Sequence, residues 1–164
     1  MALDISRFTG RFVEEARDHL SRLDDGLAHL VADPGDTESL NALFRSAHTI
    51  KGSSRMLRLA AITETAHKME DLLGALREGT LALDGPLERV LRRGLDALAA
   101  LVDALADGRP PGEADPALLE ALAHPLKAPV ASDPTPPAAP GPAAEAGPAA
   151  RAAAPEEEAA PPSP

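Results

Sequence analysis

One histidine of the chain has neighbours that suit a chemical role. On a helical wheel, His48 lies on the flank of an apolar face, with Lys51 three residues later, Gly52 four later and Arg55 seven later. These four residues share one stripe of one helix. A glycine inside a helix costs about 0.5–1 kcal/mol relative to alanine, so Gly52 calls for a functional or packing reason.

A second stripe contains the partners that a nucleophilic imidazole needs. His67 and Glu70 are three residues apart, with Gly74 one turn further, and all lie beside an apolar stripe. If the two helices are antiparallel neighbours, a carboxylate can accept the Nδ1 proton of a histidine and leave the Nε2 lone pair free to attack an electrophile. Lys51 would then lie where a transferred phosphoryl group needs positive charge.

These residues carry a family resemblance. The stretch AHTIKGSSRML, which contains His48, resembles the phosphoacceptor motif H-x-x-K-G-S/G of histidine phosphotransfer domains. Residues 1–125 resemble the N-terminal phosphotransfer domain of CheA-type chemotaxis kinases and Frz-like relatives, also through the blocks LDISRF and ETAHKMEDLL. The resemblance implies that His48 is phosphorylated and that Lys51, His67 and Glu70 form a hydrogen-bonded network around it. Arg58 departs from the pattern, because many members have glycine there.

The resemblance also implies partners. His48 would accept a phosphoryl group from ATP on a kinase catalytic domain of the same or a sister protein, and pass it to an aspartate of a response-regulator receiver domain. Gly52 and Arg55 would face the docking partners. We expect ATP and magnesium on the partner domains and no cofactor in this chain. The chain would then be a phosphoacceptor and relay rather than a complete enzyme, and its parent protein would be a histidine kinase.

The residues alone leave other interpretations open. Lys51 and Glu70 could form an exposed salt bridge, which contributes only about 0–1 kcal/mol. His48, His67 and Glu70 could hold a metal ion, although the charge of Lys51 disfavours a cation there. The chain could also be a helical interaction or dimerisation module without phosphotransfer.

The apolar stripes predict the elements that must position these residues. The first stripe starts at Phe8 in a helix over about residues 4–31, followed by a second helix capped by Asp36 or Thr37. A third begins near residues 59–62, a fourth follows the cap Asp84, and a short fifth starts near Pro116. With loops of about 4–8 residues, we expect an all-α fold, an antiparallel four-helix up-and-down bundle with a short extra C-terminal helix. We expect His19, His29 and His124 to be solvated surface residues.

Composition bounds the domains and the function classes. The last 37 of the 164 residues contain 11 of the 17 prolines and 14 alanines, so we predict a folded domain over 1–125 and a disordered Ala/Pro-rich linker over 126–164. A net charge of −10 without a basic stripe argues against nucleic-acid binding. The absence of cysteine excludes disulfides and zinc–thiolate sites. No apolar run of about 18 residues is present, so we expect no membrane insertion and a cytoplasmic protein.

Overall fold

Five helices make up the described part of the chain. The structure, a computed structural model, describes residues 4–125, so the predicted linker at 126–164 lies outside the described residues. The helices are α1 (Ile5–Ala32), α2 (Thr37–Met56), α3 (Ala60–Arg77), α4 (Gly85–Ala106) and α5 (Pro116–Ala123).

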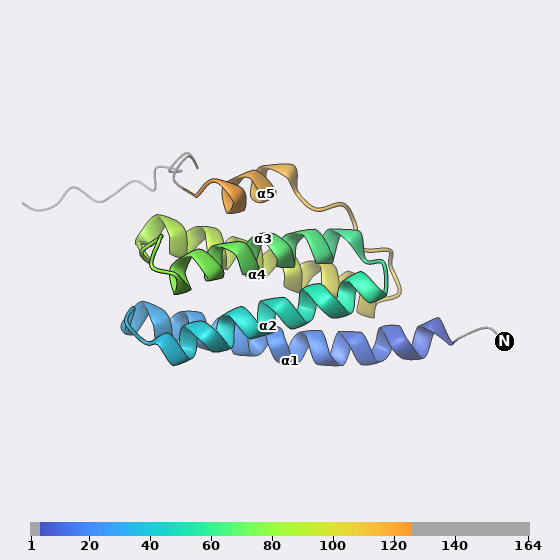
Figure 1. The fold of residues 1–164 in the computed structure, drawn as a ribbon. Coiled ribbons are helices and arrows are strands. Elements are labelled where there is room, and N and C mark those ends of the chain that lie inside the picture. The colour runs from blue at the N-terminus through green and yellow to red at the C-terminus, as the bar shows by residue number, and fades with distance from the viewer. Residues whose placement is uncertain (1–3, 126–164) are drawn as a thin grey trace, which may run out of the picture. The chain divides into compact units, whose positions relative to one another are not determined.

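The first four helices form an up-and-down bundle (Figure 1). Each packs against the next along the chain, and α1 packs against α4 to close the ring, while α5 lies on α3 and α4. The prediction of an all-α four-helix bundle with a short extra helix is therefore confirmed. Because α2 and α3 are antiparallel neighbours, the two stripes with polar residues can meet.

Aspartates begin three of the helices. The carboxylate of Asp36 accepts hydrogen bonds from the backbone N–H groups of Glu38 and Ser39, and Asp84 accepts one from Leu87 at 2.8 Å. Asp115 caps α5 in the same way, through a hydrogen bond of 2.9 Å from Ala117. Such side chains satisfy N–H groups that have no partner within the helix, which is why local sequence located these helix starts closely.

Three helices end in the same hydrogen-bond pattern. In each, the residue after the C-cap has positive φ, and its N–H and the next N–H return to carbonyls of the last turn; these residues are Arg58 (φ 57°), Gly79 (φ 76°) and Gly108 (φ 72°). This Schellman arrangement favours glycine, because a left-handed conformation costs an L-residue roughly 1–2 kcal/mol. Arg58 is thus strained where the other two positions have glycine. The turn that contains it, 57–59, is also shorter than the predicted 4–8 residues.

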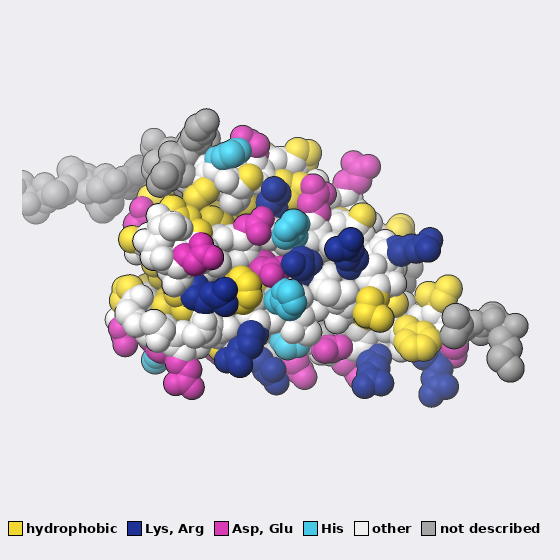
Figure 2. All heavy atoms as spheres, in the orientation of Figure 1, with side chains coloured by type: hydrophobic (Ala, Val, Ile, Leu, Met, Phe, Trp, Pro, Cys, Tyr) yellow, Lys and Arg dark blue, Asp and Glu magenta, His cyan; other side chains and the backbone are white. Residues whose placement is uncertain are grey.

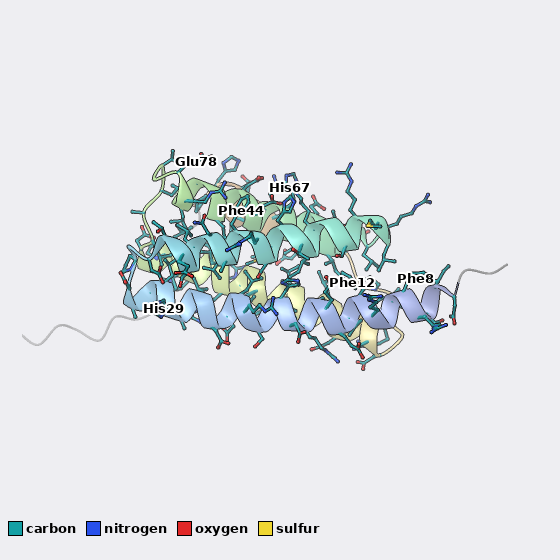
Figure 3. All side chains as sticks on the ribbon, turned by 60° about the horizontal axis from the view of Figure 1, so that its bottom comes forward. Phe8, Phe12, His29, Phe44, His67 and Glu78 are labelled. Carbon is teal, nitrogen blue, oxygen red and sulfur yellow. The ribbon has the colours of Figure 1, made fainter. Side chains whose placement is uncertain are left out.

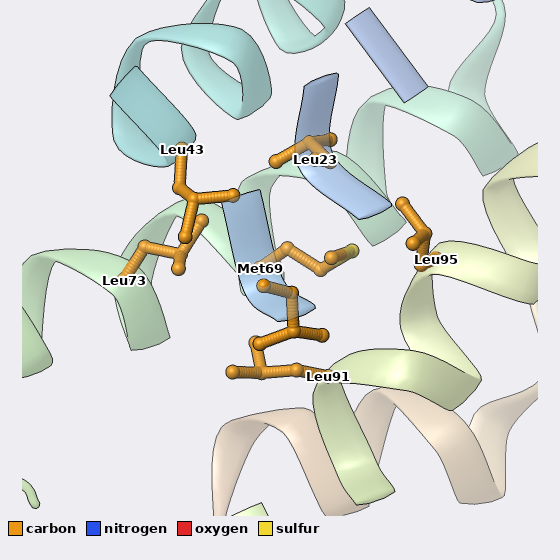
Figure 4. Close-up of a pocket in the computed structure, with 7 residues that line it drawn as sticks. Leu23, Leu43, Met69, Leu73, Leu91 and Leu95 are labelled. Carbon is orange, nitrogen blue, oxygen red and sulfur yellow. The ribbon is translucent and has the colours of Figure 1, made fainter. Parts of the chain in front are cut away.

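The apolar stripes of the helices meet in one core. Its largest fully buried apolar side chains come from all five helices: Leu30, Leu43, Ile50, Ile62, Leu73, Leu91, Leu98, Val102 and Leu122. Figure 4 shows leucines of α1, α2, α3 and α4, together with Met69, around a void of about 10 Å³. Only apolar side chains line this void, so it offers nothing to hold an ordered water.

The predicted stripe of α1 begins too early. Phe8 is 54% exposed and Ile5 is exposed as well, whereas Phe12 is buried. Figure 1 shows the first turns of α1 extending beyond the end of α2, and Figure 3 labels Phe8 in this part of α1. The expectation that Phe8 belongs to the core is wrong.

None of the helices within residues 4–125 combines the length and the apolar character that crossing a membrane requires.

Candidate functional site

The antiparallel pair α2 and α3 brings His48, Lys51 and Glu70 together. His48 Nδ1 lies 2.7 Å from Glu70 Oε1, and Lys51 Nζ lies 2.5 Å from Glu70 Oε2. No other partner of Oε2 is present among the described residues. The carboxylate therefore holds one group of α2 on each oxygen, and the prediction that the two stripes face each other is confirmed in geometry.

Glu70 is buried, contrary to its expected position on a flank. Only 7% of the residue is exposed, and its two carboxylate oxygens lie against His48 Nδ1 and Lys51 Nζ of α2. An exposed salt bridge with Lys51 is therefore wrong. Burial alone raises the pKa of Glu70, but the hydrogen bonds and charges of Lys51 and His48 outweigh burial, so the net pKa is below its ordinary value. Glu70 is thus a buried anion held by two donors.

The imidazole has a defined donor and a free nitrogen. An ionised carboxylate only accepts hydrogen bonds, so the contact with Glu70 assigns the proton of His48 to Nδ1. Nε2 then carries the lone pair, and it has no hydrogen-bond partner in the described part of the chain. With 62% of the side chain exposed, this nitrogen is open to an incoming group.

Phe44 and Arg77 form a column with the imidazole of His48. The Phe44 ring is nearly parallel to the imidazole, with 6.3 Å between centroids and 14° between planes, and the Arg77 guanidinium lies 4.0 Å from the Phe44 centroid. Figure 3 labels Phe44 on α2 and His67 on α3 at this side of the bundle. The four-residue spacing from Phe44 to His48 is the signal of this contact in the sequence.

Comparison with known proteins assigns this arrangement. The profile of the Hpt domain matches residues 7–108, which include all the residues of the site. The chain belongs to the Hpt-domain family.

Relatives of this Hpt domain include a chemotaxis protein and a sensor histidine kinase. It is 34% identical over 114 residues to the chemotaxis protein CheA of Salmonella typhimurium and 36% identical over 104 residues to the sensor histidine kinase CheAY of Helicobacter pylori. These matches cover 70% and 63% of this chain but only 17% and 13% of the relatives. The chain therefore spans less than a fifth of the length of these curated relatives.

Solved structures share the fold of this Hpt domain. The CheA phosphotransferase domain from Thermotoga maritima has a TM-score of 0.59 at 28% identity, over 61% of this chain and 95% of that one. The phosphorylated P1 domain of CheA3 in complex with CheY6 from R. sphaeroides has a TM-score of 0.61 at 27% identity, over 73% and 92%.

His67 lies near the site but outside its hydrogen bonds. Its Nε2 is 3.7 Å from Asp71 Oδ1, and no hydrogen bond joins it to His48 or Glu70 among the described residues. His48 and Lys51 of α2 already contact the two oxygens of Glu70. The structure therefore does not place His67 in the hydrogen-bonded network, contrary to the expectation. His67 instead lines an open hollow together with Lys51 and Arg55.

Gly52 and Arg55 are exposed on the same stripe of α2 as His48. A Cβ at Gly52 would meet no atom within 4 Å, so close helix packing within the described bundle does not require this glycine. Their predicted role in partner docking stays a prediction.

The remaining histidines differ in their surroundings. His29 and His124 are exposed, as expected, and lie near Asp36 and Glu120. His19 is wrong as a solvated surface residue: its side chain is only 15% exposed, because its Nδ1 turns toward Ser46 Oγ of α2 at 3.4 Å. Within residues 4–125, no three His, Asp or Glu side chains gather as metal ligands.

Proposed function

We propose that His48 carries a phosphoryl group between a kinase domain and a response regulator. The observation that carries this proposal is the hydrogen bond of 2.7 Å from His48 Nδ1 to buried Glu70, which leaves Nε2 unpaired and exposed. A solved relative is described as a phosphorylated P1 domain in complex with CheY6, which supports the same assignment.

The first step loads the histidine. Nε2 attacks the γ-phosphorus of ATP, the N–P bond forms, and the bond from phosphorus to the bridging oxygen breaks with release of ADP. No proton has to leave during attack, because Nε2 is unprotonated and Nδ1 keeps its hydrogen. The ring gains positive charge, and the carboxylate of Glu70 stabilises it through the Nδ1 hydrogen bond.

The second step unloads it. A carboxylate oxygen of an aspartate attacks the phosphorus, the N–P bond breaks, and the electron pair returns to Nε2. The imidazole leaves as a neutral ring, again with its proton on Nδ1. Glu70 thus serves both directions without taking up or giving a proton.

Lys51 supplies positive charge to the phosphoryl group. Its ammonium is anchored on Glu70 and its side chain is 24% exposed, so donors remain on the solvent side one turn from His48. Charge of this kind stabilises the transferring oxygens. Because the lysine is already fixed by Glu70, little reorganisation accompanies loading.

ATP and magnesium belong to the partner domains in this proposal. The chain itself is a substrate and relay rather than an enzyme, and the kinase catalytic domain lies in the same or a sister protein.

The test is phosphorylation by a CheA-type catalytic domain with radiolabelled ATP and magnesium. We expect one label at His48 that is stable in alkali and lost in acid, as for a phosphoramidate. His48→Gln should remove it without changing the helical circular dichroism, whereas the matched variant of exposed His29, His29→Gln, should be labelled normally. Label persisting in His48→Gln would place the phosphoacceptor elsewhere and overturn the assignment of His48, whereas no label in the native chain would favour a helical interaction module.

A further inference from the structure

A basic hollow adjoins the phosphotransfer site. Its lining includes the basic residues Lys51, Arg55 and Arg58 together with His67, and Glu64 is the carboxylate in its wall. Lys51 belongs to both places, because its ammonium also holds Glu70. On this face of the molecule, Figure 2 shows Lys and Arg side chains gathered beside histidines. The chain as a whole carries a net charge of −10, so this is a local reversal of its charge.

Two arginines of the basic hollow form no ion pair within the described residues. In the part of the chain that the structure describes, neither Arg55 nor Arg58 has a carboxylate within ion-pair distance. Both side chains are exposed. Their charges are therefore free for an external group.

The backbone at Arg58 strengthens this point. Arg58 has φ 57° at a helix end where the equivalent positions after α3 and α4 are Gly79 and Gly108. An arginine there sacrifices stability that a glycine would provide. Within the described residues, the side chain makes no hydrogen bond or ion pair that would offset this strain.

Distance decides which anion the arginines meet. Arg55 is seven residues after His48, which is about 10 Å along the helix axis at about 1.5 Å per residue. In an in-line attack by His48 Nε2, the leaving polyphosphate lies on the far side of the phosphorus from the imidazole. Arginines about two turns along α2 are therefore better placed to contact the protein that presents the reacting group than the leaving phosphates.

On the basis of the proposed function, we propose that Arg55 and Arg58 dock the acidic rim around the acceptor aspartate of a receiver domain. A receiver must find the phosphorylated protein by diffusion, and opposite charges near the site raise the rate of productive encounters. A kinase domain tethered in the same protein gains much less, because its local concentration is already high.

The test measures transfer separately from loading. The full chain is phosphorylated by a CheA-type catalytic domain, purified, and mixed with the CheY-type receiver that accepts fastest from the native protein. For Arg55→Gln with Arg58→Gln, we expect the second-order transfer rate at about 50 mM salt to fall on the order of tenfold, and the difference to shrink to about twofold near 1 M salt. The maximal rate at saturating receiver should stay unchanged.

Two variants control for charge and folding. Arg93→Gln removes the same charge from exposed α4 and should transfer normally. Arg58→Gly should raise the melting temperature by about 2–5 °C, since the left-handed strain is relieved, and yet slow transfer. Stability and transfer moving in opposite directions rules out misfolding as the cause.

The outcomes separate this inference from the proposed function. If the native chain is not phosphorylated or transfers to no receiver, the proposed function fails. If native transfer is normal but the Arg55 and Arg58 variants match Arg93→Gln, only the receiver-docking inference is overturned. Slower loading by the kinase domain with unchanged transfer would also overturn it, because the basic hollow would then dock the donor.

Discussion

Lys51 Nζ lies 2.5 Å from Glu70 Oε2 at a point where the carboxylate is buried and the lysine side chain is 24% exposed. The other oxygen of Glu70 accepts from His48, so one buried anion fixes both the nucleophile and the cation beside it. Stability and chemistry are thereby coupled at a single residue.

The coupling predicts a pH dependence of folding stability. The pKa of Glu70 in the folded protein is below its ordinary value of 4.5, so the native state binds fewer protons than the unfolded state across the interval between the two. The stabilisation is complete above 4.5 and is lost as pH falls through the folded-state pKa. In urea unfolding from about pH 7 to about pH 3, the difference in free energy of unfolding between the native protein and Glu70→Gln should shrink as the pH drops. A pH-independent difference, as expected for the exposed-site control Glu14→Gln, would contradict this.

Replacing Lys51 should lower the free energy of unfolding by more than the loss of an exposed ion pair would. In Lys51→Met, Glu70 Oε2 stays buried without a partner, and such a group costs about 1–3 kcal/mol. Phosphorylation of His48 should slow as well, because the charge beside the phosphoryl group is gone. Denaturant unfolding and loading kinetics check both effects. Lys68→Met, a lysine of α3 with no ion pair in residues 4–125, should change neither, and an unchanged stability of Lys51→Met would refute the prediction.

The column of Arg77, Phe44 and His48 predicts that Arg77 and Phe44 help to position the imidazole of His48. The cation over the Phe44 ring should be worth about 0.5–1 kcal/mol, so Arg77→Ala should slow loading about 2- to 5-fold through a looser imidazole. Arg77→Lys should restore part of the rate, since it keeps the cation. Arg45→Ala, an exposed arginine next to Phe44 in sequence, should be neutral. Equal effects of Arg77→Ala and Arg77→Lys would contradict a cation–π contribution.

Two helical glycines should respond oppositely to alanine. A Cβ at Gly94 would lie 2.9 Å from Met69 Sδ and 3.3 Å from Leu122 Cδ2, so the side chains of Met69 and Leu122 would have to shift within the core. Overpacking of this kind costs about 1–3 kcal/mol, more than the helix preference of alanine returns. At Gly52 the space is open, and alanine should stabilise. Thermal unfolding of Gly94→Ala and Gly52→Ala gives the two signs, and stabilisation by Gly94→Ala would show that the core yields.

Local sequence was sufficient for the elements and insufficient for burial. The caps Asp36, Asp84 and Asp115 act on N–H groups two or three residues away, so their effect is visible in sequence. The burial of Glu70 and the half-buried state of His19 depend on what a neighbouring helix places over them. A helical wheel contains no information about that cover.

The candidate site shows the same division. Spacing and the family resemblance predicted that His48, Lys51 and Glu70 meet, and in the structure they do. The same signals predicted His67 in this network, but His67 lies beside Asp71 of its own helix. The departure at Arg58 was visible as a missing glycine, but its positive φ follows from how α2 must end to let α3 return.

Gly52 offers the sharpest separation of stability from activity. Side chains on a helix lean toward its N-terminus and cover the preceding turn, so a glutamine at position 52 would extend toward His48, four residues earlier. A Cβ there meets nothing within 4 Å, so Gly52→Gln should keep or raise stability by up to about 0.5–1 kcal/mol while blocking both loading and transfer. Gly10, an equally open helical glycine on α1, provides the matched variant Gly10→Gln, which should stabilise similarly and transfer normally. Thermal unfolding and the two transfer assays decide: normal transfer by Gly52→Gln would mean that partners do not approach His48 over this turn.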